Sequence, residues 1–210
     1  MDVTLEISAS FLLFVFSAAF TPGPNNIMIM ASGVNHGVMA SVPHLLGITV
    51  GVPTMFLAVG FGLSYTFEQI SWLHALIQVL GIFYLLYLAW LIANSSKASF
   101  SSDESSQPFT FLQAALFQWV NPKAWMLGTG AIATFTTVGG DLNSQILIMA
   151  AVFFVMTLPS VFVWLVFGSW LKKILTKSSH LVIFNRTMAG LLVLSVLPVL
   201  KGLALNYNLF

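Results

Sequence analysis

The chain has 210 residues, of which 58% are hydrophobic and 6% are charged, with a formal net charge of +1 and no cysteine. A soluble domain carries about 25% charged residues, so this composition excludes an ordinary water-soluble protein and predicts an all-α integral membrane protein surrounded by lipid. The near-neutral charge gives no reason to expect a nucleic-acid partner, and the lack of cysteine excludes disulfides, thiol catalysis and thiolate metal sites.

Six apolar segments are candidates for membrane spans. The hydrocarbon core of a bilayer is about 30 Å thick, which takes about 20 helical residues to cross. The predicted transmembrane helices lie at roughly 7–31, 43–65, 71–93, 109–137, 144–169 and 184–205. In the second of these, Gly47 and Gly51 have the four-residue spacing that lets helices approach closely.

The first segment contains a break in its middle. Residues 21–26 read Thr-Pro-Gly-Pro-Asn-Asn, and the apolar stretch before them is too short to cross the bilayer alone. Each proline lacks an N–H and clashes with the preceding turn, so a regular helix cannot continue here. We expect one span of two half-helices with an unwound middle, which a membrane tolerates only where protein or a water-filled cavity surrounds it. The alternative is a proline kink that binds no ligand.

The second half of the chain repeats this plan. A serine-rich hydrophilic linker at 94–108 separates residues 1–93 from residues 109–210, and Asn-Pro-Lys at 121–123 interrupts the fourth segment. A broken span, a proline-kinked span and a plain span therefore occur in the same order twice. Three spans is an odd number, so the halves enter the membrane in opposite orientations. This predicts two inverted three-helix repeats with broken first helices, whose interruptions meet in one site near the midplane.

Basic residues favour one orientation. The loop after the fifth segment carries Lys172, Lys173 and Lys177, and Lys97 lies in the linker. By the positive-inside rule, the linker and this loop face the cytoplasm and both termini face outward.

Lys123 is the only charged residue well inside a predicted span. Charge there is costly, which makes Lys123 a functional candidate, and no acidic residue lies deep in a span to pair with it. An anionic ligand group would suit it; the alternative is that Lys123 snorkels to an interface or caps carbonyl groups at the break. Half-helix N-termini also favour an anion, and the amides of Asn25, Asn26 and Asn121 suit an ammonium or hydroxyl. Together these groups predict a site for a small zwitterion.

His36 and His44 are candidates for proton coupling, because histidine titrates near neutral pH. Each also fits an ordinary loop or interfacial histidine. No cluster of acidic residues or histidines indicates a metal site, and no P-loop, Gly-x-Ser-x-Gly or His-Glu-x-x-His motif indicates an enzyme. We expect no enzymatic activity, no cofactor and no bound metal, and any uphill transport would draw on an ion gradient.

The two breaks, together with Gly33-x-x-x-Gly37, resemble the motifs of the LysE/RhtB amino-acid exporters, and the resemblance covers essentially the whole chain. It implies amino-acid efflux through the bacterial inner membrane by proton antiport, often as a homodimer; in that membrane, the outward-facing termini that the basic residues predict would be periplasmic. The Thr-Pro-Gly-Pro-Asn-Asn pattern is similar to the branch that exports cysteine and O-acetylserine. The lack of a deep carboxylate to hold a basic side chain also favours neutral amino acids.

We therefore predict an efflux permease for small neutral amino acids, with its site at the two breaks. The predicted substrate-binding residues are Thr21, Pro22, Gly23, Pro24, Asn25, Asn121, Pro122 and Lys123. One alternative is a channel or divalent-cation exporter of this architecture, which would require acidic or histidine ligands within the spans. Another is a non-transporting membrane subunit that binds a partner through the Gly47/Gly51 face.

Overall fold

The computed structural model describes residues 2–63, 71–98, 107–136, 141–175, 177–197 and 200–201. These residues form helices and connecting turns without any strand, which confirms the all-helical prediction. The α-helices are α1 (Asp2–Phe20), α2 (Pro24–His36), α3 (Val42–Ala58), α5 (Ser71–Ala98), α6 (Phe111–Phe117), α7 (Pro122–Phe135), α8 (Leu142–Ile174) and α9 (Ser178–Leu194). Three short helical turns are η1 (Met39–Ser41), η2 (Val59–Leu63) and η3 (Gln118–Val120).

Some of these helices are long enough to span a bilayer alone. Met39–Gly62 and Leu142–Ile174 pass by length and hydropathy, and Ala9–Phe20 with Pro24–His36 forms a third candidate that bends by 47° at its break. In the other predicted segments, the helical stretches that are clearly apolar are shorter: Ile82–Asn94 within α5, Phe111–Val120 and Ser179–Leu194.

The third predicted segment is longer than expected. α5 continues to Ala98, five residues beyond the boundary placed at 93. Residues 94–98 contain neither proline nor glycine, so nothing in the backbone chemistry stops the helix there. The rest of the predicted linker, at 99–106, lies outside the described residues.

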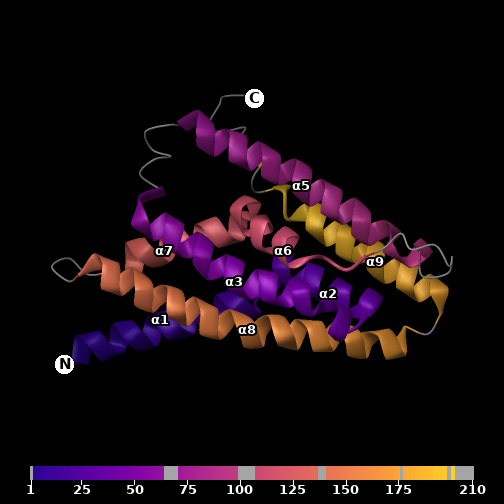
Figure 1. The fold of residues 1–210 in the computed structure, drawn as a ribbon, viewed down its shortest axis with the longest axis horizontal. Helices are drawn as coiled ribbons and strands as arrows, with labels where there is room; N and C mark the ends of the chain where they lie inside the picture. Colours follow the sequence, from indigo (N-terminus) through magenta and orange to yellow (C-terminus); the bar gives the residue numbers. More distant parts are fainter. Residues whose placement is uncertain are drawn as a thin grey trace.

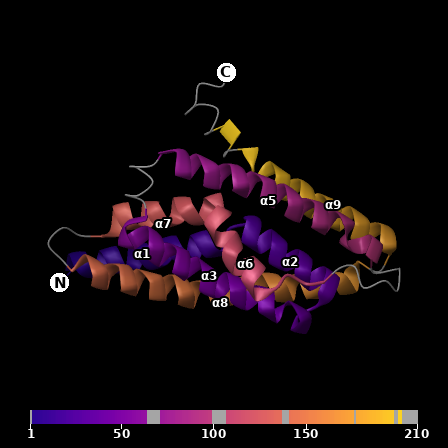
Figure 2. The same ribbon diagram turned by 45° about the horizontal axis from the view of Figure 1, so that its top comes forward.

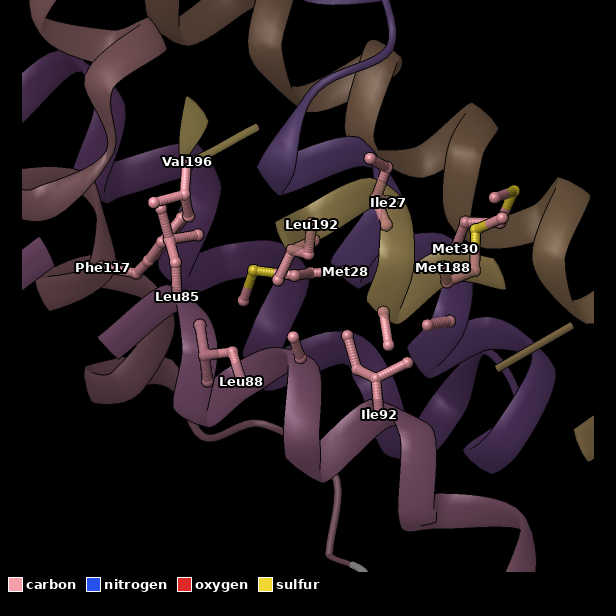
Figure 3. Close-up of a cluster of buried hydrophobic side chains, with 13 residues drawn as sticks. Ile27, Met28, Met30, Leu85, Leu88, Ile92, Phe117, Met188, Leu192 and Val196 are labelled. Atoms are coloured by element: carbon pink, nitrogen blue, oxygen red, sulfur yellow. The ribbon is translucent and has the colours of Figure 1, made fainter. Parts of the chain in front are cut away.

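The helices form two groups with α2 between them. α8 runs along one edge of the molecule with α1, α2 and α3 against it, while α5 and α9 lie side by side along the opposite edge (Figure 1, Figure 2). A buried apolar cluster joins α2 to the second group, as Figure 3 shows. Its members from these helices include Ile27, Met28 and Met30 of α2, Leu85, Leu88 and Ile92 of α5, and Met188 and Leu192 of α9.

Glycines set the closest helix crossings. A Cβ on Gly168 of α8 would lie 2.9 Å from the carbonyl carbon of Met30 in α2, closer than real Cβ contacts come. A Cβ on Gly51 of α3 would lie 2.8 Å from the Cα of Ala115 in α6. Gly47 faces the carbonyl oxygen of Phe111 in the same way, so the Gly47/Gly51 face does let helices approach closely. Because α6 covers this face, it is not open to a partner, as the non-transporting alternative required.

The outer surface of the helices is apolar. Large side chains that are more than 60% exposed include Leu13, Phe83, Met126, Val155 and Ile183. A water-soluble protein rarely exposes apolar surface on this scale, whereas lipid covers it without cost. The surface thus agrees with the composition: the protein is an integral membrane protein.

Candidate functional site

The first break lies between α1 and α2. α1 ends at Phe20, and α2 begins with Pro24 at its first position, where the missing N–H of proline costs no helical hydrogen bond. Gly23 is the N-cap residue and its backbone is extended, with φ −174° and ψ 179°. The need for glycine is therefore one of space: a Cβ here would lie 2.9 Å from Cδ of Lys123 and 3.1 Å from its Nζ.

Asn26 braces this break. Its Nδ2 donates to the carbonyl oxygens of Ala19, at 2.8 Å, and of Thr21, at 2.9 Å. The last carbonyls of a helix have no partner within it, so a side chain that returns across the break satisfies them. Ser160 of α8 donates its hydroxyl to the same Ala19 oxygen at 2.7 Å, which ties the broken span to α8.

The second break follows α6. The 3₁₀ turn η3 leads into Asn121, whose Oδ1 accepts from the backbone N–H of Lys123 at 3.2 Å and so caps α7, with Pro122 at the first helical position. The indole Nε1 of Trp125 donates to the carbonyl oxygen of Trp119 at 2.9 Å and spans the break. The side-chain cap and the proline explain why a new helix starts here.

The structure brings the two breaks together. Lys123 Nζ, at the start of α7, donates to the carbonyl oxygen of Thr21 in the first break at 2.8 Å. Asn25 of α2 and Gln118 of η3 exchange two amide hydrogen bonds of 2.9 Å each. Contact between the breaks, predicted from their repeated pattern, is thus present in the fold. Lys123 does bond a carbonyl at a break, as the capping alternative stated, and two of its three ammonium protons are left over.

Gln118 is a central residue that the sequence analysis missed. It is fully buried, and its Nε2 also donates to the carbonyl oxygen of Ala114 at 2.9 Å, while its Oε1 accepts from Asn121 at 3.3 Å. One glutamine amide therefore holds the two asparagines that flank the breaks. Its position one turn before Asn-Pro-Lys is the only signal that could have indicated this role.

A cavity of about 60 Å³ lies at the meeting point. At about 10–15 Å³ for each water, it holds about four to six water molecules, the scale of a small solute. Its polar lining side chains are Asn25, Asn26, Asn121, Lys123, Thr157 and Ser160, and its larger apolar ones are Ile48, Val52, Phe56, Leu127, Phe153 and Val161.

The predicted site residues take different places around this cavity. Gly23, Asn25, Asn121 and Lys123 line it, while Pro22, Pro24 and Pro122 shape the backbone without lining it. Thr21 takes part through its carbonyl oxygen, which accepts the hydrogen bond from Lys123. Its hydroxyl donates to the carbonyl oxygen of Ser17 in α1. The α8 wall, with Thr157 and Ser160, was not predicted at all.

The two histidines lie away from the cavity. His36 is the last residue of α2 and is half-buried. His44 is fully buried in α3, with its Nδ1 2.8 Å from Ser32 Oγ of α2 and its ring 4.9 Å from that of Phe109. His44 is therefore not a loop residue: it lies in the first turn of α3, and the short turn η1 places the start of α3 against α2. Within the part of the chain that the structure describes, no three acidic or histidine side chains could hold a metal ion.

Comparison with known proteins decides the family. The chain matches the LysE type translocator family over residues 16–200, a range that includes both breaks and the α8 wall of the cavity. The chain belongs to this family. A LysE type translocator is a transport protein and not an enzyme, so the cavity is a candidate substrate site and not a catalytic one.

Relatives of this LysE type translocator carry a more specific name. The cysteine/O-acetylserine efflux protein of Klebsiella pneumoniae subsp. pneumoniae is 34% identical over 134 residues, which are 63% of this chain and 67% of the relative. The proteins of the same name from Escherichia coli K12 and Shigella sonnei are 31% identical over the same shares. No solved structure matches the chain.

Proposed function

We propose that this translocator exports small neutral amino acids, with cysteine and O-acetylserine as first candidates, through the bacterial inner membrane. One observation carries the proposal: the ammonium of Lys123 lies in a cavity that both breaks line, and none of the described residues that line this cavity is acidic. Lys123 is half-buried, and a cation in such a place without a carboxylate partner favours an anion, which a substrate carboxylate supplies. The names of the relatives agree with an amino-acid substrate.

The neighbouring amides support a carboxylate at this position. Asn25 Oδ1 and Asn121 Oδ1 both accept bonds within the protein, and each Nδ2 uses one of its protons on Gln118. Each asparagine thus retains one N–H, beside the two protons that Lys123 retains. Apolar walls strengthen such charge-assisted hydrogen bonds, because little water competes for them.

The proposed transport cycle is alternating access to a site at the junction of two inverted three-span halves, residues 1–93 and 109–210, which are joined by the linker 94–108. Two findings support it: the breaks that head the two halves meet at one cavity, and helices occupy all six predicted segments. Broken helices from two repeats form the substrate site of many secondary transporters. The positive-inside rule supports periplasmic termini.

Coupling to proton entry is a further part of the proposal. His44 and Ser32 link α3 to α2, the half-helix that carries Asn25 into the site, so protonation of His44 would act on that link. His36 at the end of α2 is the second candidate. The homodimer rests on the family resemblance alone, and the mass of the purified protein in detergent tests it.

The test is efflux from intact cells. Cells loaded with cysteine-containing dipeptides release free cysteine, which is followed in the medium for wild type, Lys123→Met and Lys123→Arg. Lys172→Met is the matched control, because Lys172 is exposed in the last turn of α8.

We expect wild type and Lys172→Met to release cysteine faster than the empty vector, Lys123→Met to lose the gain, and Lys123→Arg to retain part of it. O-Acetylserine is assayed in the same medium. Wild-type release equal to the vector for every amino acid would refute the exporter, while full release by Lys123→Met would retain the exporter and exclude this site.

A further inference from the structure

The polar groups of the cavity divide into donors and acceptors. Main-chain contacts fix the orientations of the amides: both partners of Asn26 Nδ2 are carbonyl oxygens, Asn121 Oδ1 accepts from an N–H, and Gln118 Nε2 donates to a carbonyl. Among the lining side chains, Lys123 and the remaining N–H groups of Asn25 and Asn121 are hydrogen-bond donors. Asn26 has used both of its amide protons, so only its Oδ1 is left for the cavity.

Thr157 belongs to the acceptor group. A threonine inside a helix normally donates its hydroxyl to the carbonyl four residues before it, and Thr49, the other buried threonine of the described helices, does so at 2.9 Å from Leu45 O. Thr157 is only 6% exposed, yet its hydroxyl bonds to none of the described residues. Thr157 is one of the residues that line the cavity.

Three oxygens make up this acceptor group. Asn26 Oδ1 has no hydrogen-bond partner in the described part of the chain. Like the Thr157 hydroxyl, it is not among the fully inaccessible atoms without a partner, so it retains some accessible surface. Ser160 donates its only proton to Ala19 O, the same atom that Asn26 contacts, so toward the cavity its Oγ can only accept. Thr157 lies three residues before Ser160, on the same face of α8.

We propose that Asn26 Oδ1, Thr157 Oγ1 and Ser160 Oγ form an ammonium subsite beside the Lys123 carboxylate subsite. The inference rests on the proposed function and deepens it: the translocator recognises the unmodified α-amino group of its substrate. An ammonium has three N–H donors and no acceptor, which matches three oxygens of this kind. Asn26 and Lys123 both bond the Thr21 carbonyl oxygen, so the two subsites are close enough for one amino acid.

This arrangement also explains why the side chain of the proposed substrate carries no charge. One cation binds at the three oxygens and one carboxylate at Lys123, and the other large lining side chains, such as Phe56 and Phe153, are apolar. A second charge on the substrate side chain would lie against these walls without a partner, which is costly. The chemistry selects small α-amino acids with a free amino group.

The test compares cysteine with 3-mercaptopropionate, which is cysteine without its amino group. Binding of both is measured by calorimetry on the purified protein in lipid nanodiscs, for wild type, Thr157→Val and Thr157→Ser. Thr49→Val is the matched control, since Thr49 is equally buried but satisfied within its helix and absent from the cavity lining.

Wild type should bind cysteine at least tenfold more tightly than 3-mercaptopropionate. Thr157→Val should weaken cysteine binding by about tenfold to a hundredfold, the range for a lost hydrogen bond to a charged group, and leave 3-mercaptopropionate unchanged. Thr157→Ser and Thr49→Val should keep the wild-type preference.

Equal wild-type affinity for the two compounds would overturn the ammonium subsite, and that result needs no variant to fold. So would a Thr157→Val protein that keeps the full preference. If wild type neither binds nor exports cysteine or O-acetylserine, the proposed function itself fails and this inference fails with it.

Discussion

Replacing Gln118 with leucine removes the amide that holds both breaks while nearly preserving side-chain volume. The change breaks the two hydrogen bonds with Asn25 and the bond from Asn121. Hydrogen bonds between membrane helices average about 0.6 kcal/mol and reach about 1.7 kcal/mol, so losing the Asn25 pair should cost about 1–3 kcal/mol of folding free energy. Asn25 then turns freely in the cavity, and an orientation penalty of about 1 kcal/mol on substrate binding would raise the KM for efflux about fivefold.

A second amide pair in the chain provides a matched control. Asn35 of α2 and Asn185 of α9 exchange hydrogen bonds of 2.9 and 2.8 Å, and neither residue lines the cavity. Asn185→Leu breaks one such pair and should therefore cost about 1–3 kcal/mol of folding free energy but leave the KM unchanged. Unfolding in graded detergent mixtures measures stability, and efflux at several internal cysteine concentrations measures the KM. The reasoning is wrong if both variants raise the KM equally, or if Gln118→Leu lowers stability alone.

Three glycine substitutions test the packing and the site separately. Gly168→Leu should prevent folding, because its side chain would collide with the Met30 carbonyl group, and overpacking against backbone costs about 3 kcal/mol or more. Gly190→Leu should fold, since nothing lies within 4 Å of a Cβ at that position. Fluorescence-detected size exclusion separates these outcomes, and a monodisperse Gly168→Leu protein would contradict the crossing. Gly23→Ala should fold normally, because its extended backbone suits alanine, but it should lower efflux several-fold, about three- to tenfold, by displacing the flexible Lys123 side chain. Unchanged efflux would show that the position of Lys123 near Gly23 is unimportant.

The sequence predicts the breaks because their cause is local. Proline and glycine interrupt a helix wherever they occur, so Gly23 and the Asn-Pro-Lys motif were found without any knowledge of tertiary structure. An uncompensated lysine in an apolar segment is equally conspicuous. Four of the eight predicted substrate residues accordingly line the cavity. Contact between the breaks followed from the repeat, not from any single residue.

The missed residues have ordinary surroundings in the sequence. Gln118, Thr157 and Ser160 sit in apolar helices where a polar side chain commonly bonds its own backbone or a neighbouring helix. Only the tertiary structure shows that Thr157 makes no such bond while Thr49 does. His44 was misplaced for a similar reason: the start of a helix is usually exposed, and its burial depends on how η1 turns the chain.

The glycine crossing between α2 and α8 determines which parts of the molecule can move separately. At Gly33 and Gly168 the two backbones touch, so neither helix can slide or rotate on the other without a steric collision. The break at the start of α2 therefore moves together with the part of α8 that carries Thr157. By contrast, α2 meets Gln118 and Asn185 through uncharged amides, which can part and be rehydrated without exposing a bare charge. Any opening of the cavity should therefore separate these amide pairs. α2 and α8, although they come from different halves of the chain, should move together as one rigid unit.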